Sequence, residues 1–253
     1  MREGAGALYH SLLSPALNLR LIEPRTAVAR AEAAWRAGAA PIASVEGFVR
    51  QIAGWREFVR GIFFHAGPEY RHRNELRAHG EVPAFFSTGE TDMRCVADVA
   101  VRIGRTAYAH HIERLMVMGL YAMLAAIDPA ALNAWHQESL LDAYEWASTP
   151  NVIGMSQYAD GGLVATKPYA ASGKYINRMS NYCRSCRFRP DRATGEEACP
   201  FTTLYWDFLA RHRERLSGNR RMKFQLANLD QKPDAERAAI DRRAQALREE
   251  HAS

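Results

Sequence analysis

The stretch Tyr182-Cys183-Arg184-Ser185-Cys186 and the pair Cys199-Pro200 thirteen residues after it contain three of the four cysteines in the chain. The fourth, Cys95, lies far upstream. Two cysteines spaced C-x2-C with distant partners are typical of a metal site, because thiolate ligands need only converge in space. Four thiolates can hold zinc or a 4Fe–4S cluster, and the proline after Cys199 favours the cluster. Four unligated buried thiols are the alternative.

The length and composition of the chain are those of a globular protein. It has 253 residues, of which 47% are hydrophobic and 24% charged. The formal net charge of +5 mildly favours an anionic partner such as nucleic acid. We find no signal-peptide pattern and no apolar run of membrane-spanning length, so no membrane association is expected. A reducing compartment suits free thiolates, which predicts a cytoplasmic protein.

The hydrophobic periodicity predicts an all-α fold. Ser44 is predicted to cap a helix that runs to about His65 and carries Gln51, Trp55 and Arg56. Further helices are expected over 26–36, 108–127 and 129–148 and from about 203, whereas strand-like alternation is scarce. The domain prediction is a helical domain over 1–227, followed by a charged C-terminal helix within 228–253.

Three segments contain candidate site residues. Ser11 to Asn18 combines hydroxyl side chains with a proline at a helix start, which suits either a bound phosphate or a simple helix cap. His110 and His111 point about 100° apart if both are helical, so they cannot easily chelate one metal. Either could face a pocket as a proton donor or be a satisfied core histidine. Asp142 lies among apolar residues and needs a polar partner.

With these residues in view, the chain resembles the iron–sulfur branch of the cryptochrome/photolyase family, the bacterial (6-4) photolyase-like proteins. The resemblance covers nearly the whole chain. The matching stretches are 12–18, 47–52, 54–61, 108–111, 150–157, 166–173, 199–201 and 204–209.

The resemblance implies a helical domain that binds FAD and a 4Fe–4S cluster. It places the cluster ligands at Cys95, Cys183, Cys186 and Cys199. It places His110 and His111 beside the flavin and the DNA lesion, Tyr169 near that pocket and Trp135 in an electron path. The implied FAD-binding residues are His10, Ser11, Ser14, Asn18, Gln51, Trp55, Arg56 and Asp142.

The chemistry implied by the resemblance is that of a DNA lyase. Light drives an electron from reduced FAD into a pyrimidine (6-4) photoproduct of UV-damaged DNA, and the lesion is flipped into the pocket. A histidine then donates a proton to the lesion. The basic residues near the cysteines are expected either to contact the DNA backbone or to form a solvated loop. They are Arg178, Arg184, Arg187 and Arg189. We expect a monomer.

The chain also departs from the family pattern. The α/β antenna domain that usually precedes this region is absent, so we expect a fragment or half of a split protein, with an antenna domain acting in trans as one option. Ser87 replaces an expected tryptophan of the electron path, and His136 replaces a tyrosine. Leu120, Ser148 and Arg20 also depart from it. Two alternatives follow: a cryptochrome-like blue-light or redox sensor without repair activity, or a truncated, non-catalytic iron–sulfur module that binds nucleic acid.

Overall fold

The computed structural model describes residues 1–250, and within this range the prediction of an all-α fold is confirmed. The described part has no β-strand longer than an isolated bridge. The α-helices are α1 (Ser14–Asn18), α2 (Pro24–Arg36), α3 (Ile42–Val49), α4 (Glu57–Ala66), α5 (Phe85–Thr88), α6 (Arg94–Thr106), α7 (His111–Glu113), α8 (Leu120–Ala125), α9 (Pro129–Ser139), α10 (Glu145–Thr149), α11 (Gly173–Met179), α12 (Pro200–Arg211), α13 (Arg213–Leu216), α14 (Lys223–Asp230) and α15 (Asp234–Glu249). The π-helical segments are η1 (Arg50–Arg56), η3 (Arg114–Gly119) and η4 (Pro150–Ser156), and the 3-10 turns are η2 (Pro68–His72) and η5 (Tyr182–Arg184).

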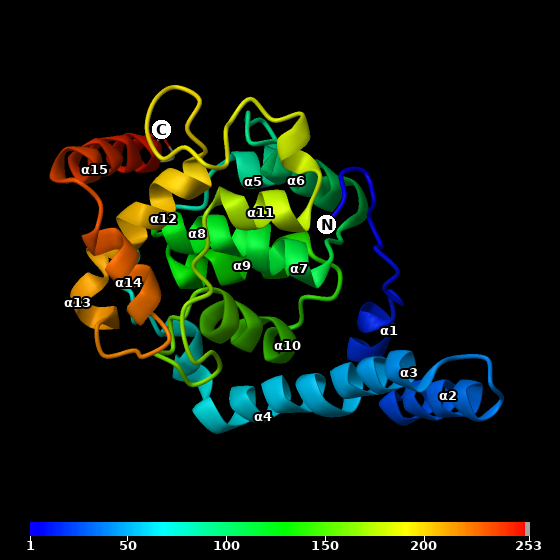
Figure 1. The fold of residues 1–253 in the computed structure, drawn as a ribbon. Helices are drawn as coiled ribbons and strands as arrows, with labels where there is room; N and C mark the ends of the chain where they lie inside the picture. Colours follow the sequence, from blue (N-terminus) through cyan, green and yellow to red (C-terminus); the bar gives the residue numbers. More distant parts are fainter. Residues whose placement is uncertain (251–253) are drawn as a thin grey trace.

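Helix α8 lies at the centre of the main core. All six of its residues are buried, as expected for the apolar run that follows the histidines. Helix α12 packs against α8 on one side and against α15 on the other (Figure 1). Ile240 and Ala244 of α15 are buried in that contact, and Arg248 pairs with the carboxylate of Asp207. The C-terminal helix therefore packs on the core through its apolar stripe. The division at residue 228 remains a prediction, and its last residues, 251–253, lie outside the described range.

The helix predicted over residues 44–65 is a continuous run of α3, η1 and α4. The prediction of Ser44 as its cap is wrong, because the helix begins at Ile42 after Pro41, whose extended backbone (φ −71°, ψ 147°) precedes the first turn. Figure 1 shows α2 and α3 side by side beyond the main body. We call α2, α3 and η1 the helical arm. A second, smaller core of Leu17, Ala27 and Ile52 joins this helical arm to α1.

The prediction of a single helix over residues 129–148 is also wrong. Asp128 caps α9 as expected, accepting hydrogen bonds from the backbone of Ala130 and Ala131. The helix then ends at Ser139, because Leu140 is extended and buried in the core. Leu141 donates its backbone N–H to Ala107 instead of continuing the helix. The resulting turn between α9 and α10 carries Asp142.

No helix in residues 1–250 combines the length and apolarity needed to cross a bilayer.

Candidate functional site

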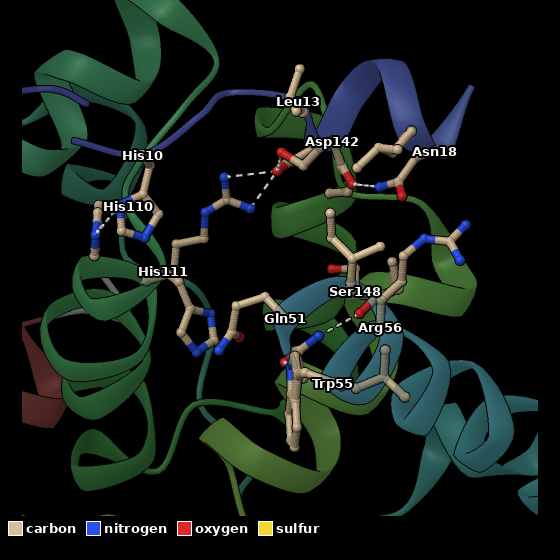
Figure 2. Close-up of a pocket in the computed structure, with 18 of the residues that line it drawn as sticks. His10, Leu13, Asn18, Gln51, Trp55, Arg56, His110, His111, Asp142 and Ser148 are labelled. Atoms are coloured by element: carbon tan, nitrogen blue, oxygen red, sulfur yellow. Dashed lines mark hydrogen bonds and ion pairs between the residues drawn. The ribbon is translucent and has the colours of Figure 1, made fainter. Parts of the chain in front are cut away.

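A cavity of about 970 Å³ opens between the helical arm and the main core. Its size is at the upper end of the range typical of small-molecule and cofactor sites. All of the residues predicted to bind FAD line this cavity, as do both adjacent histidines (Figure 2). These residues are His10, Ser11, Ser14, Asn18, Gln51, Trp55, Arg56, His110, His111 and Asp142. The fold brings them together from distant parts of the chain, and their role in FAD binding stays a prediction.

Each of the three π-helical segments contributes to the wall of this cavity. Segment η1 provides Gln51, Trp55 and Arg56, η3 provides Arg114, and η4 provides Asn151. The wider turn of a π-helix displaces side chains from the α-helical spacing, and such segments are frequent at functional sites. The apolar spacing predicted a helix over residues 44–65 and 108–127, which contain η1 and η3, and it gave no sign of the wider turns.

His110 is the N-cap of α7, not a helical residue as the sequence predicted. Its Nδ1 accepts the backbone N–H of Ile112 at 3.0 Å. The other ring nitrogen, Nε2, must then carry the proton, and it lies 3.0 Å from Nδ1 of His10. The cap therefore selects one neutral tautomer that donates from Nε2 towards His10. Burial and the neighbouring His10 lower the pKa of His110 to about 4.

His111 is the first residue of α7, and its side chain is exposed to the cavity. Figure 2 shows it on the wall opposite Arg56. Although it reaches the open cavity, enough protein surrounds its ring for desolvation, with the charge of Arg114, to lower its pKa to about 4. Both histidines are therefore neutral near pH 7 in the protein without a ligand.

Asp142 is held by Arg114, a cavity residue that the sequence analysis missed. The Arg114 guanidinium contacts the two carboxylate oxygens at 2.8 and 3.3 Å, and Ser14 Oγ donates to Oδ2 at 2.6 Å. Asn18 donates its amide to the Asp142 carbonyl. Burial opposes ionisation of Asp142, but the charge and hydrogen bonds of Arg114 outweigh it and lower its pKa. Arg114 follows His111 by three residues, about one helical turn, which was the available signal.

The far wall contains the guanidinium of Arg56. The Arg56 guanidinium lies over the Trp146 ring, 4.8 Å from its centroid. Its Nε is buried and makes no hydrogen bond within the described residues. Beside it, Trp55 donates its indole N–H to Asn151 at 3.1 Å. The Arg56 guanidinium also pairs with Glu57 through Nη1, so this wall carries a cation that suits a polar or anionic ligand but is already partly neutralised.

Two of the predicted catalytic residues do not line this cavity. Tyr169 is 38% exposed and lies in the segment between η4 and α11. Trp135 is buried behind the wall, with its ring 5.0 Å from that of His136, a lining residue. Its indole N–H donates to Ser87 Oγ at 3.2 Å. Their catalytic roles remain predictions.

The four cysteines line a second, much smaller cavity together with Tyr182 and Phe201. Burial and the neighbouring cysteines raise the pKa of Cys95 and Cys183, the latter to about 12, and burial raises that of Cys199 to about 11. Within residues 1–250, no three His, Cys, Asp or Glu side chains are grouped closely enough to hold one metal ion. Four thiols that face one void fit the donor set of a cluster, in which each iron takes a different cysteine.

No protein-family model matches the chain. A (6-4) photolyase from Agrobacterium fabrum is 54% identical over 215 residues, which make up 85% of this chain and 42% of that protein. The chain belongs to the photolyase-like family. The resemblance read from the sequence motifs is therefore confirmed.

The photolyase-like chain spans about two fifths of the length of this relative. An uncharacterized protein of Acanthamoeba polyphaga mimivirus is also similar, with 32% identity over 115 residues, which cover 46% of this chain and 85% of that protein.

Proposed function

We propose that this chain binds FAD in the large cavity and a 4Fe–4S cluster at the four cysteines, and that it repairs pyrimidine (6-4) photoproducts in DNA. One observation carries the proposal: the residues expected to contact FAD, which lie between His10 and Asp142 in the sequence, all line one cavity of about 970 Å³. Membership of the photolyase-like family supports it.

The wall of the cavity has groups suited to each part of a flavin dinucleotide. Ser11 and Arg56 offer a hydroxyl and a guanidinium for phosphates. Apolar residues such as Phe48, Ile52 and Leu115 cover the remaining surface and exclude water from the ring system. When bound, FAD would supply the light-driven electron transfer of the reaction.

The two histidines are the proposed proton-donating groups. His110 and His111 line the cavity as neutral imidazoles, and the single N–H of His110 is directed at His10. A full proton transfer requires an imidazolium, and a pKa of about 4 leaves little of it at neutral pH. The negative charge of bound DNA would raise both pKa values towards neutrality, which confines the general-acid form to the complex with substrate.

The cysteine site would hold the cluster close to the proposed DNA-binding surface. Arg178, Arg184 and Arg189 are exposed around it and are available for phosphate contacts, whereas Arg187 already pairs with Asp92. The distribution of positive charge supports DNA as the partner of this face.

An absorption spectrum of anaerobically purified protein, with iron and zinc analysis, tests the proposal. We expect flavin bands, a broad cluster shoulder and about four irons per chain. A light-dependent assay on DNA with a (6-4) photoproduct should then show repair by the wild type and none by His111→Ala, which keeps its flavin. Zinc without flavin, or equal repair by both proteins, would contradict the proposal.

The second candidate is a light or redox sensor that binds FAD and repairs nothing. Ser87 favours it, because a hydroxyl stands beside the Trp135 indole where a redox-active ring is expected. Flavin photoreduction without loss of (6-4) photoproducts would support the sensor.

A further inference from the structure

A buried polar cluster lies between the two sites. Glu113 has no exposed surface, and its carboxylate accepts two hydrogen bonds from the Arg102 guanidinium, at 2.7 and 3.2 Å. Arg102 also donates to Asp98 at 2.8 Å. The hydroxyl of Tyr182 lies 3.0 Å from Glu113 Oε1 and 3.1 Å from Asp98 Oδ2. Two carboxylates, one guanidinium and one phenol thus form a closed cluster, which we call the Glu113 cluster.

One end of the Glu113 cluster is attached to the wall of the large cavity. Glu113 Oε2 accepts the backbone N–H of His110 at 3.3 Å, which completes the capping box of α7. This bond holds the backbone at the point where the His110 ring turns towards His10. A shift of the Glu113 carboxylate would therefore move His110.

The other end is attached to the cysteine site. Tyr182 directly precedes Cys183, begins the η5 turn and lines the small cavity with the four cysteines. Its ring is completely buried. We call residues 182–199, which contain Cys183, Cys186 and Cys199, the cysteine loop. Any change in this loop that moves Tyr182 must move its hydroxyl relative to Glu113.

The N-terminal segment, residues 1–13, meets the same cluster. Gly4 donates its backbone N–H to Asp98 at 3.2 Å, and Glu3 donates to the Asn181 side chain at 2.8 Å. This segment then carries His10 to its contact with His110. Asp98 thus contacts the segment that carries His10, and Glu113 contacts the backbone of His110. The Tyr182 hydroxyl lies against both carboxylates.

We infer that Tyr182 is a positioning residue: through Glu113, its hydroxyl transmits the conformation of the cysteine loop to His110 on the wall of the large cavity. The inference deepens the proposed function, since it couples the two proposed cofactor sites. The physical basis is that a buried, hydrogen-bonded charge cluster has few alternative arrangements, because each displaced partner leaves a desolvated polar group. Packing of the ring alone would give Tyr182 no such role.

The experiment removes only the hydroxyl. Tyr182→Phe keeps the buried ring, and Tyr205→Phe is the matched control, because Tyr205 is a partly buried tyrosine on α12 away from the cluster. The first readout is the NMR signal of the His110 ring in the 253-residue chain without FAD, assigned with His110→Gln. The second is the affinity of each protein for added FAD.

We expect Tyr182→Phe to shift the His110 ring signals and to weaken FAD binding roughly three- to tenfold, the effect of one lost hydrogen bond. Tyr205→Phe should change neither. Replacing Cys183 by serine should shift His110 in the wild-type background and have a smaller effect in Tyr182→Phe, as a double-mutant cycle for coupled residues requires.

Unchanged His110 signals in folded Tyr182→Phe would overturn the inference. If wild-type protein bound no FAD, the proposed function would fail. The His110 signals would still show whether the Tyr182 hydroxyl positions His110. Should Tyr182→Phe fail to fold, Glu113→Gln preserves side-chain size and allows the same two measurements, and unshifted His110 signals there would again overturn it.

Discussion

The large cavity and the cysteine cavity differ in what already holds them together. The wall of the large cavity contains polar groups that satisfy one another, such as Arg114 with Asp142 and His110 with His10. The cysteine cavity is small, and burial raises the pKa of Cys95, Cys183 and Cys199, which favours their neutral thiol form. A ligand would therefore complete a formed site in the first region, whereas in the second the proposed metal would supply the charge that makes thiolates stable.

The largest effect is expected at the cysteine site. Cys186→Ala removes one of the four thiols, and because metal binding at such a site contributes directly to folding, the product should be insoluble or free of iron. Soluble yield and iron content per chain measure this. Ser185→Ala, an exposed position between the two cysteines, is the control and should keep its iron. Soluble Cys186→Ala with full iron content would remove the contrast between the regions.

In the large cavity, Arg114→Met should destabilise the protein by about 2–4 kcal/mol, because it leaves the Asp142 carboxylate partly buried without a cation. Chemical denaturation measures the loss. Arg36→Met, which breaks an exposed pair with Glu32, should cost about 0.5 kcal/mol or less. Equal losses in the two variants would mean that the Arg114 pair does not hold the wall.

Steric crowding should affect the cysteine cavity specifically. A methyl group at Gly173 would lie 2.7 Å from Cys199 Sγ and 3.0 Å from Thr202 Oγ1, so Gly173→Ala should cost about 1–3 kcal/mol and lower iron content. Gly104→Ala in α6 meets nothing within 4 Å and should stabilise the protein by up to about 1 kcal/mol. Thermal unfolding with iron analysis compares the two. Retained iron in Gly173→Ala would mean that this wall can move.

The smallest effect is on the pH dependence of stability. Burial lowers the pKa of His136 from 6.5 to about 4, so between these values the unfolded chain binds a proton that the folded protein does not. The titration of His136 therefore leaves the free energy of unfolding unchanged above about pH 6.5 and lowers it as the pH falls towards 4. His136→Gln should reduce the slope of unfolding free energy against pH by less than one proton. The exposed His65→Gln is the control, and identical slopes would refute the assignment.

Local sequence signals predicted the parts of the structure that depend on nearby residues. The spacing of apolar residues identified the buried α8, and Asp128-Pro129 marked the start of α9. The end of α9 could not be predicted, since it depends on the packing of Leu140 and the bond from Leu141 to Ala107. Asp142 was recognised as needing a partner, but Arg114 could be identified only once the turn after α9 was placed against η3.

By itself, the sequence determined the helical fold class, the family and the presence of four cysteines in a metal-binding pattern, because periodicity and motif spacing are local properties of the chain. Tertiary structure alone decided that His110 is an N-cap paired with His10, that three π-helical segments line one cavity, and that Tyr182 joins Glu113 between the two sites. These features arise from contacts between residues up to about a hundred positions apart. Such contacts form only when the core has packed, so no pattern along the chain encodes them in readable form.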